Sequence, residues 1–176
     1  MAYKNNVMID IETLSTRPDA LILTIAAVKF QRGGKKTRDG EKFYVRVCPE
    51  SCRQKGLHID AATQMWWENQ CEEARYEALL NTDRIPLVQA LDRLSAFIGS
   101  TDIVWANSPS FDCVILENAY SVCGKLAPWK FWNLRDLRTL KDLAGIKYHS
   151  VQNNHNALED CYNQIDLAQK CFSKLL

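Results

Sequence analysis

The fold of this chain is decided by residues 6–12, which read Asn-Val-Met-Ile-Asp-Ile-Glu. The apolar residues predict a central, largely buried strand. Asp10 and Glu12 stand two apart, so their side chains point to the same face of that strand. Two carboxylates side by side in a buried strand repel each other and lose hydration. Either a cation offsets this cost or the strand has already ended and both groups are solvated, and the pair alone does not decide between these alternatives.

The rest of the chain alternates between strand and helix patterns. Strands are predicted at 21–30 and 42–48, where glycine-containing turns separate them into an antiparallel meander with the first strand. Further strands are expected at 102–106 and 129–132, and helices at 60–67, 86–98, 111–123, 134–144 and 156–175. This order predicts an α/β fold, a mixed five-stranded sheet with helices on both faces.

Length and composition predict one globular domain over residues 1–176, with 47% hydrophobic residues. The net charge is only +1, which excludes a polybasic protein that coats nucleic acid by bulk charge. The charge is uneven, however. Residues 29–46 contain seven basic and two acidic residues, and residues 60–120 contain three basic and ten acidic ones. Residues 125–141 combine five basic residues and one acid with three aromatics, a mixture that suits a single nucleic-acid strand.

The start of the chain has no apolar signal region, and no stretch reaches the roughly 18 apolar residues of a membrane span. The seven cysteines are an odd number and mostly scattered, which predicts free thiols in a reducing compartment. Cys48 and Cys52 are the only close pair, so a zinc site is not expected. These observations predict a cytoplasmic protein without membrane contact.

Two more acidic positions follow predicted strand ends or helix starts. Asp112 falls in the first turn of a helix just after the strand at 102–106, where the helix dipole alone also explains an acid. His155 stands at or just before the start of the last helix, and Asp160 lies within that helix. Each position alone is weak, because a lone histidine or one of two neighbouring acids usually has no special function. His58 and His149 have no comparable acidic neighbours and are interpreted as structural.

Together these positions suggest a common chemistry. Strand ends and helix starts are where α/β sheets build their sites. Carboxylate oxygens without a thiol or imidazole cluster fit Mg²⁺ or Mn²⁺. Two such ions would activate a water and stabilise the leaving oxygen in phosphodiester hydrolysis, with His155 as the natural general base.

Three segments of the chain resemble the DnaQ-like, or DEDDh, 3′–5′ exonucleases of the ribonuclease H-like fold. Residues 10–13 (Asp-Ile-Glu-Thr) are similar to the first motif of that family, 107–112 to the second, and His155-x-Ala157-x-x-Asp160 to the third. The small stand-alone branch of phage exonucleases and the mycobacterial RNase AS is more similar still. That similarity rests on residues 9–14, 17–20, 66–67 and 135–140. Residues 107–111 depart from the His-Asn-Ala-x-Phe form of proofreading subunits, which disfavours that assignment.

The resemblance implies roles for individual residues. Asp10, Glu12 and Asp160 would bind one metal, Asp10 would bridge to a second held by Asp112, and His155 would be the base. The substrate would be the 3′ end of a single strand of DNA or RNA, released as nucleoside 5′-monophosphates. The residues that would contact its terminal nucleotide are Thr13, Leu14, Asn107 and Phe111. Of these, Leu14 would wedge against the terminal base. A homodimer, in a bacterial or phage-infected cell, is also implied.

Two other functions stay open at this point. One is a ribonuclease H-like endonuclease or resolvase, and the other is a non-catalytic nucleic-acid-binding module on the same fold. The aromatic residues add a further expectation, since most of them should pack in the core and one or two should line a dimer interface or the substrate. These aromatics are Trp66, Trp67, Trp129, Phe131 and Trp132.

Overall fold

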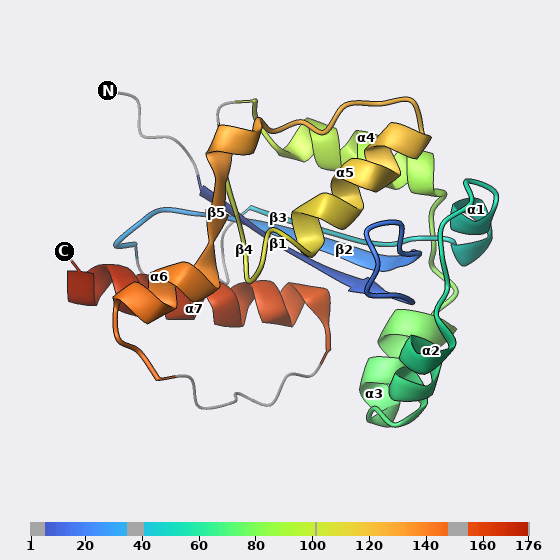
Figure 1. Cartoon of the computed structure of the whole chain (residues 1–176), viewed down its shortest axis with the longest axis horizontal. Coiled ribbons are helices and arrows are strands. Elements are labelled where there is room, and N and C mark those ends of the chain that lie inside the picture. Colours follow the sequence, from blue (N-terminus) through green and yellow to red (C-terminus); the bar gives the residue numbers. More distant parts are fainter. Residues whose placement is uncertain (1–5, 35–40, 101, 148–154, 176) are drawn as a thin grey trace.

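The computed structural model describes residues 6–34, 41–100, 102–147 and 155–175 (Figure 1). Five strands form one sheet in the order β3-β2-β1-β4-β5. The strands are β1 (Asn6–Thr13), β2 (Ile22–Phe30), β3 (Lys42–Arg46), β4 (Ile103–Ala106) and β5 (Leu134–Asp136). The first three are antiparallel neighbours, whereas β4 pairs with β1 and β5 pairs with β4 in parallel. The prediction of a mixed five-stranded sheet is confirmed.

Helices cover both faces of the sheet, α4 (Leu87–Phe97) and α5 (Asp112–Val122) on one face and α6 (Leu137–Leu143) and α7 (Ala157–Leu175) on the other (Figure 1). Alternation along β1 divides the core accordingly, because successive side chains point to opposite faces. Val7, Ile9 and Ile11 pack with α4 and α5. Met8 packs with α7 and α6. Asp10 and Glu12 therefore lie on the α7 face of the sheet, beyond Met8.

Shorter helices lie beyond the end of the sheet that β1 reaches at Thr13 (Figure 1). They are α1 (Pro49–Arg53), α2 (Ala61–Glu68), α3 (Glu72–Arg75) and a π-helical turn at Tyr76–Leu80. Asp60 caps α2, with its side chain accepting the N–H of Ala62. Two bonds join α2 to the end of β1: the Asp60 N–H donates to the Leu14 carbonyl at 2.8 Å, and the Trp67 indole donates to the Thr13 carbonyl at 2.9 Å.

The fifth strand does not lie at residues 129–132, where the run of aromatic residues predicted it. Residues 131–133 form a 3-10 turn, and β5 comes directly after it at Leu134–Asp136. The helix expected from residue 134 accordingly begins only at Leu137, with Asp136 as its cap. The prediction failed because aromatic residues favour strands by propensity, whereas a three-residue strand at the sheet edge carries almost no pattern of its own.

The expectation that most of the five aromatics lie in the core is also wrong. Trp67 and Trp129 are buried, but Trp66, Phe131 and Trp132 are 42%, 78% and 60% exposed. A run of bulky aromatics does not by itself reveal which side of a turn faces solvent. Among the described residues, no helix has the length and apolar character needed to cross a membrane.

Candidate active site

Three acidic side chains meet where β1 passes under the start of α7. Asp10 and Glu12 come from β1, and Asp160 comes from the first turn of α7. Carboxylate oxygens of the three all lie within 4.8 Å of one another. The thiol of Cys161 points to the Met8 carbonyl at 3.6 Å, which fixes α7 over the strand. Hence the packing of α7 on β1 is what brings Asp160 to the pair.

Asp112 joins the group from the opposite layer. It is the first residue of α5, and its carboxylate accepts the backbone N–H of Ile11 at 3.3 Å. Asp112 is 4% exposed and Asp160 8%, so both are almost completely buried. The four acids named in the sequence analysis therefore lie around the same part of β1.

Burial raises the pKa of all four carboxyls. It brings Glu12 to about 8, Asp112 to about 7 and Asp160 to about 6, and the pKa of Asp10 rises well above its usual value. At Asp10 and Glu12, repulsion from the neighbouring carboxylates adds to the effect of burial. Charging these groups together is unfavourable unless a cation neutralises them.

The donor set fits hard divalent cations. Asp10, Glu12 and Asp160 offer oxygens at the spacing of a shared ion, and the cluster contains neither a thiolate nor an imidazole that would favour a softer metal. Gln164, one turn after Asp160 on α7, donates its amide to Asp10 at 2.6 Å. Its own carbonyl oxygen, Oε1, is buried and has no partner among the described residues. Unpaired buried acceptors of this kind are rare in proteins, and this one belongs to the side chain that contacts Asp10.

His155 lies two residues before α7, at the edge of this group. Its backbone has a φ of +45°, in the left-handed region that few residues other than glycine adopt. Partial burial lowers the pKa of its imidazole, which keeps the ring neutral at physiological pH. The ring lies edge-on to Trp66 and Trp67 of α2, with centroid distances of 4.7 and 6.2 Å. A neutral imidazole that lines the same cavity as the carboxylates is suited to accept a proton.

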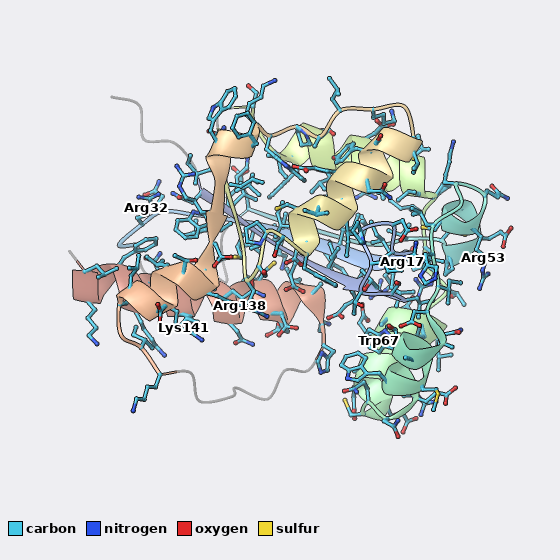
Figure 2. The ribbon with its side chains drawn as sticks, in the orientation of Figure 1. Arg17, Arg32, Arg53, Trp67, Arg138 and Lys141 are labelled. Atoms are coloured by element: carbon cyan, nitrogen blue, oxygen red, sulfur yellow. The ribbon has the colours of Figure 1, made fainter. Side chains whose placement is uncertain are left out.

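These residues line a cavity of about 590 Å³ that runs along α7. The four carboxylates and His155 line it together with Asn107 and Phe111, as predicted for residues of one site. Basic side chains also line it: Arg138, Lys147 and Lys170. Figure 2 shows Arg138 on the α6 side and Trp67 on the α2 side of the site. The cavity thus combines an acidic group with cations suited to phosphates.

Two of the predicted nucleotide-binding residues do not reach the cavity. Thr13 and Leu14 are each only 6% exposed, and neither side chain lines it. The Thr13 hydroxyl donates to the Ser15 carbonyl at 2.7 Å, which turns the chain at the end of β1. A wedge role for Leu14 requires its side chain to leave the core when substrate binds.

Sequence reasoning missed Gln164 and the function of Arg138. Gln164 was detectable in principle, because residues four apart share one face of a helix and Asp160 was already assigned. Arg138 belongs to the basic stretch 125–141 that suits a nucleic-acid strand, but only the fold shows that it lies beside the acids. His58 agrees with its structural interpretation, because its Nδ1 lies 2.9 Å from the Ser15 hydroxyl. His149 lies outside the described residues.

Comparison with known proteins identifies the class of protein to which this chain belongs. Residues 5–172 match the family model described as the 3′–5′ exoribonuclease Rv2179c-like domain. The exodeoxyribonuclease of Enterobacteria phage T4 is 25% identical over 156 residues, covering 75% of this chain and 68% of the phage protein.

Solved structures of E. coli exonuclease I share the fold. Its complex with a dT13 oligonucleotide has a TM-score of 0.70 at 15% identity and 97% coverage of this chain. Its zinc-bound form with single-stranded DNA has a TM-score of 0.63 at 17% identity and 94% coverage. The chain spans only 41% and 40% of the two E. coli chains.

The ribonuclease H-like sheet and the acidic site at the end of β1 define a 3′–5′ exonuclease of the DnaQ-like class. Within that class, this chain belongs to the 3′–5′ exoribonuclease Rv2179c-like domain family.

Proposed function

We propose that residues 1–176 form one exonuclease domain that uses two divalent cations to hydrolyse the 3′-terminal phosphodiester of single-stranded nucleic acid. The products are nucleoside 5′-monophosphates. The observation that carries the proposal is the convergence of four carboxylates from β1, α5 and α7 beside a neutral histidine in one cavity. A binding module gains nothing from four carboxylates with raised pKa values, whereas a two-metal hydrolase requires them.

Each carboxylate has a role in holding the cations. Asp10, Glu12 and Asp160 would hold one ion, and Asp112, with Asp10, would hold the second. When bound, the ions supply Lewis-acid stabilisation of the attacking and leaving oxygens. Mg²⁺ or Mn²⁺ suits this all-oxygen donor set.

His155 takes the proton of the attacking water. Its lowered pKa keeps the ring unprotonated and able to accept at neutral pH. Gln164 holds Asp10 in orientation through its 2.6 Å bond. Asn107 and Phe111 line the cavity and contact the terminal nucleotide, and Arg138, Lys147 and Lys170 hold phosphates of the same strand.

The single-stranded substrate is supported by the cavity, which accommodates a few hundred cubic ångströms of ligand, and by the oligonucleotide complexes of E. coli exonuclease I. The family description names an exoribonuclease and the phage relative is an exodeoxyribonuclease. RNA and DNA strands are therefore compared directly in the test. The homodimer implied by the resemblance is tested separately, by measuring the molar mass of the protein with light scattering after size-exclusion chromatography.

The test uses oligonucleotides labelled at the 5′ end, as RNA and as DNA, with Mg²⁺, Mn²⁺ or EDTA. The expected result is a ladder that shortens from the 3′ end only with metal. Asp160→Asn should abolish the ladder, whereas the matched variant Glu159→Gln should keep it, because Glu159 does not line the cavity. Cleavage of a circular single strand would instead indicate an endonuclease. Full activity of Asp10→Ala in a clean preparation would disprove the proposal.

A further inference from the structure

The imidazole of His155 is one of three mutually edge-on aromatic rings. Its centroid lies 4.7 Å from that of Trp66 at an interplanar angle of 82°, and 6.2 Å from that of Trp67 at 75°. The two indoles stand 5.1 Å apart at 78°. Edge-to-face pairs of this kind are favourable beyond the area they bury, and they fix the orientation of a ring.

The two tryptophans differ in what else they do. Trp67 is 1% exposed, and its indole N–H donates to the Thr13 carbonyl at 2.9 Å. It therefore belongs to the core and anchors α2 to the end of β1. Trp66 is 42% exposed and is absent from both core clusters. Packing in the core therefore does not account for the large apolar ring of Trp66, whereas its contact with His155 does.

His155 needs such a neighbour. A catalytic base is normally oriented by a hydrogen bond from its second nitrogen to a carboxylate or carbonyl. Within residues 6–34, 41–100, 102–147 and 155–175, no hydrogen bond to the His155 ring is found, and its closest described ring contact is Trp66. Its backbone is also held in the left-handed region, at a φ of +45°. Such strained conformations persist where surrounding contacts hold them.

We propose that Trp66 is a positioning residue that fixes the orientation of the His155 imidazole, which lines the cavity with the carboxylates, by edge-on packing. The inference rests on the proposed role of His155 as general base. Trp67 ties α2 to β1, the strand that carries Glu12, and so fixes the distance between α2 and the acidic group. Trp66 then fixes the orientation of the His155 ring. A base displaced by about 1 Å loses on the order of 100-fold in rate, which gives the indole a measurable effect.

The test measures kcat and KM separately for Trp66→Ala, Trp66→Phe and, as an aliphatic counterpart of the phenylalanine variant, Trp66→Leu. Trp66→Ala should lower kcat about 10- to 100-fold and leave KM within about twofold. Trp66→Phe should recover most of kcat because it restores an aromatic edge. Trp66→Leu should resemble Trp66→Ala, and it replaces that variant if the alanine protein does not fold. The matched control is Tyr76→Ala, another exposed aromatic outside the cavity, which should behave as wild type.

A double-mutant cycle identifies the route of the effect. If Trp66 acts through His155, Trp66→Ala should lower kcat no further in a His155→Ala background. An equal loss in both backgrounds would overturn the inference. So would a raised KM with unchanged kcat, since that would make Trp66 a platform for a substrate base. Wild-type activity of His155→Ala would instead refute the base itself, so the two failures are distinguishable.

Discussion

Asp112 accepts the backbone N–H of Ile11, the residue that separates Asp10 from Glu12 on β1. One hydrogen bond therefore ties the helix that supplies the fourth carboxylate to the strand that supplies the first two. The bond also lowers the pKa of Asp112, which burial otherwise raises. In the proposed site, the Asp112 side chain would therefore serve both as a metal ligand and as a support for β1.

Substitution of Asp112 should separate these two roles. Asp112→Asn keeps an oxygen that can accept the Ile11 N–H, whereas Asp112→Ala leaves that buried donor unsatisfied at a cost of about 1–3 kcal/mol. Both variants should lose activity by at least about 100-fold. Urea unfolding in EDTA should find the alanine variant less stable than the asparagine variant. Equal stability of the two would show that the 3.3 Å bond does not support the strand.

The raised pKa values predict that the metal-free protein becomes less stable as pH rises. Acidic side chains of the unfolded chain ionise near pH 4, whereas Asp160, Asp112 and Glu12 ionise near 6, 7 and 8 in the folded protein. Between these limits the folded state binds more protons, so its free energy of unfolding falls as pH rises. In EDTA, Glu12→Gln should therefore be more stable than wild type by about 2 kcal/mol or more at about pH 8.5, with little difference at about pH 4.

Thermal unfolding across that pH range, with and without Mg²⁺, measures this effect. Mg²⁺ should raise the Tm of wild type more at high pH than at low pH, because only the ionised carboxylates bind it. A gap between wild type and Glu12→Gln that does not change with pH would contradict the assigned pKa of Glu12.

Gln164 should set the affinity for metal. Gln164→Ala removes the amide that orients Asp10 and should weaken the apparent affinity for Mg²⁺ about 10- to 100-fold, with much of kcat recovered at saturating metal. Activity titrated against Mg²⁺ measures the shift. Gln169→Ala is the matched control, since Gln169 lies on the same helix but bonds to Gln31 and Gly33. If Gln164→Ala reaches half-maximal activity at the same Mg²⁺ concentration as wild type, Gln164 does not contribute to metal binding.

Arg138 should contribute to substrate capture more than to chemistry. Arg138→Gln removes one cation from the cavity and should raise KM several-fold with a smaller change in kcat. The slope of log KM against log salt concentration should fall by about 0.7, the value for one lost contact with a single strand. Arg53→Gln, on the distant helix α1 (Figure 2), should change neither. A salt slope unchanged from wild type would contradict a phosphate contact.

The parts of the fold with strong periodicity were predictable. The buried strand at residues 6–12 and the last helix carry enough apolar residues to fix their type and their faces. The grouping of Asp10, Glu12, Asp112 and Asp160 followed from the rule that strand ends and helix starts meet at one edge of a sheet. Once α7 was placed on the sheet, the position of Asp160 followed from its place in the first turn.

Tertiary contacts were not predictable from local pattern. The edge-on packing of Trp66 against His155 joins residues 89 positions apart, and neither has a sequence neighbour that signals the other. The short strand β5 is stabilised by pairing with β4 rather than by its own residues, so propensity placed a strand over the preceding aromatics instead. The buried side chains of Thr13 and Leu14 likewise depend on α2, which closes over the end of β1.

The order in which the site residues occur along the chain has a consequence for biosynthesis. Asp10 and Glu12 leave the ribosome first and Asp160 last, and α7 must pack against β1 before the acidic group exists. While α7 is still inside the ribosome, Asp160 is missing from its group with Asp10 and Glu12. Under the proposed mechanism, such a chain would lack one metal ligand, so nuclease activity is expected only after α7 has left the ribosome and packed on β1.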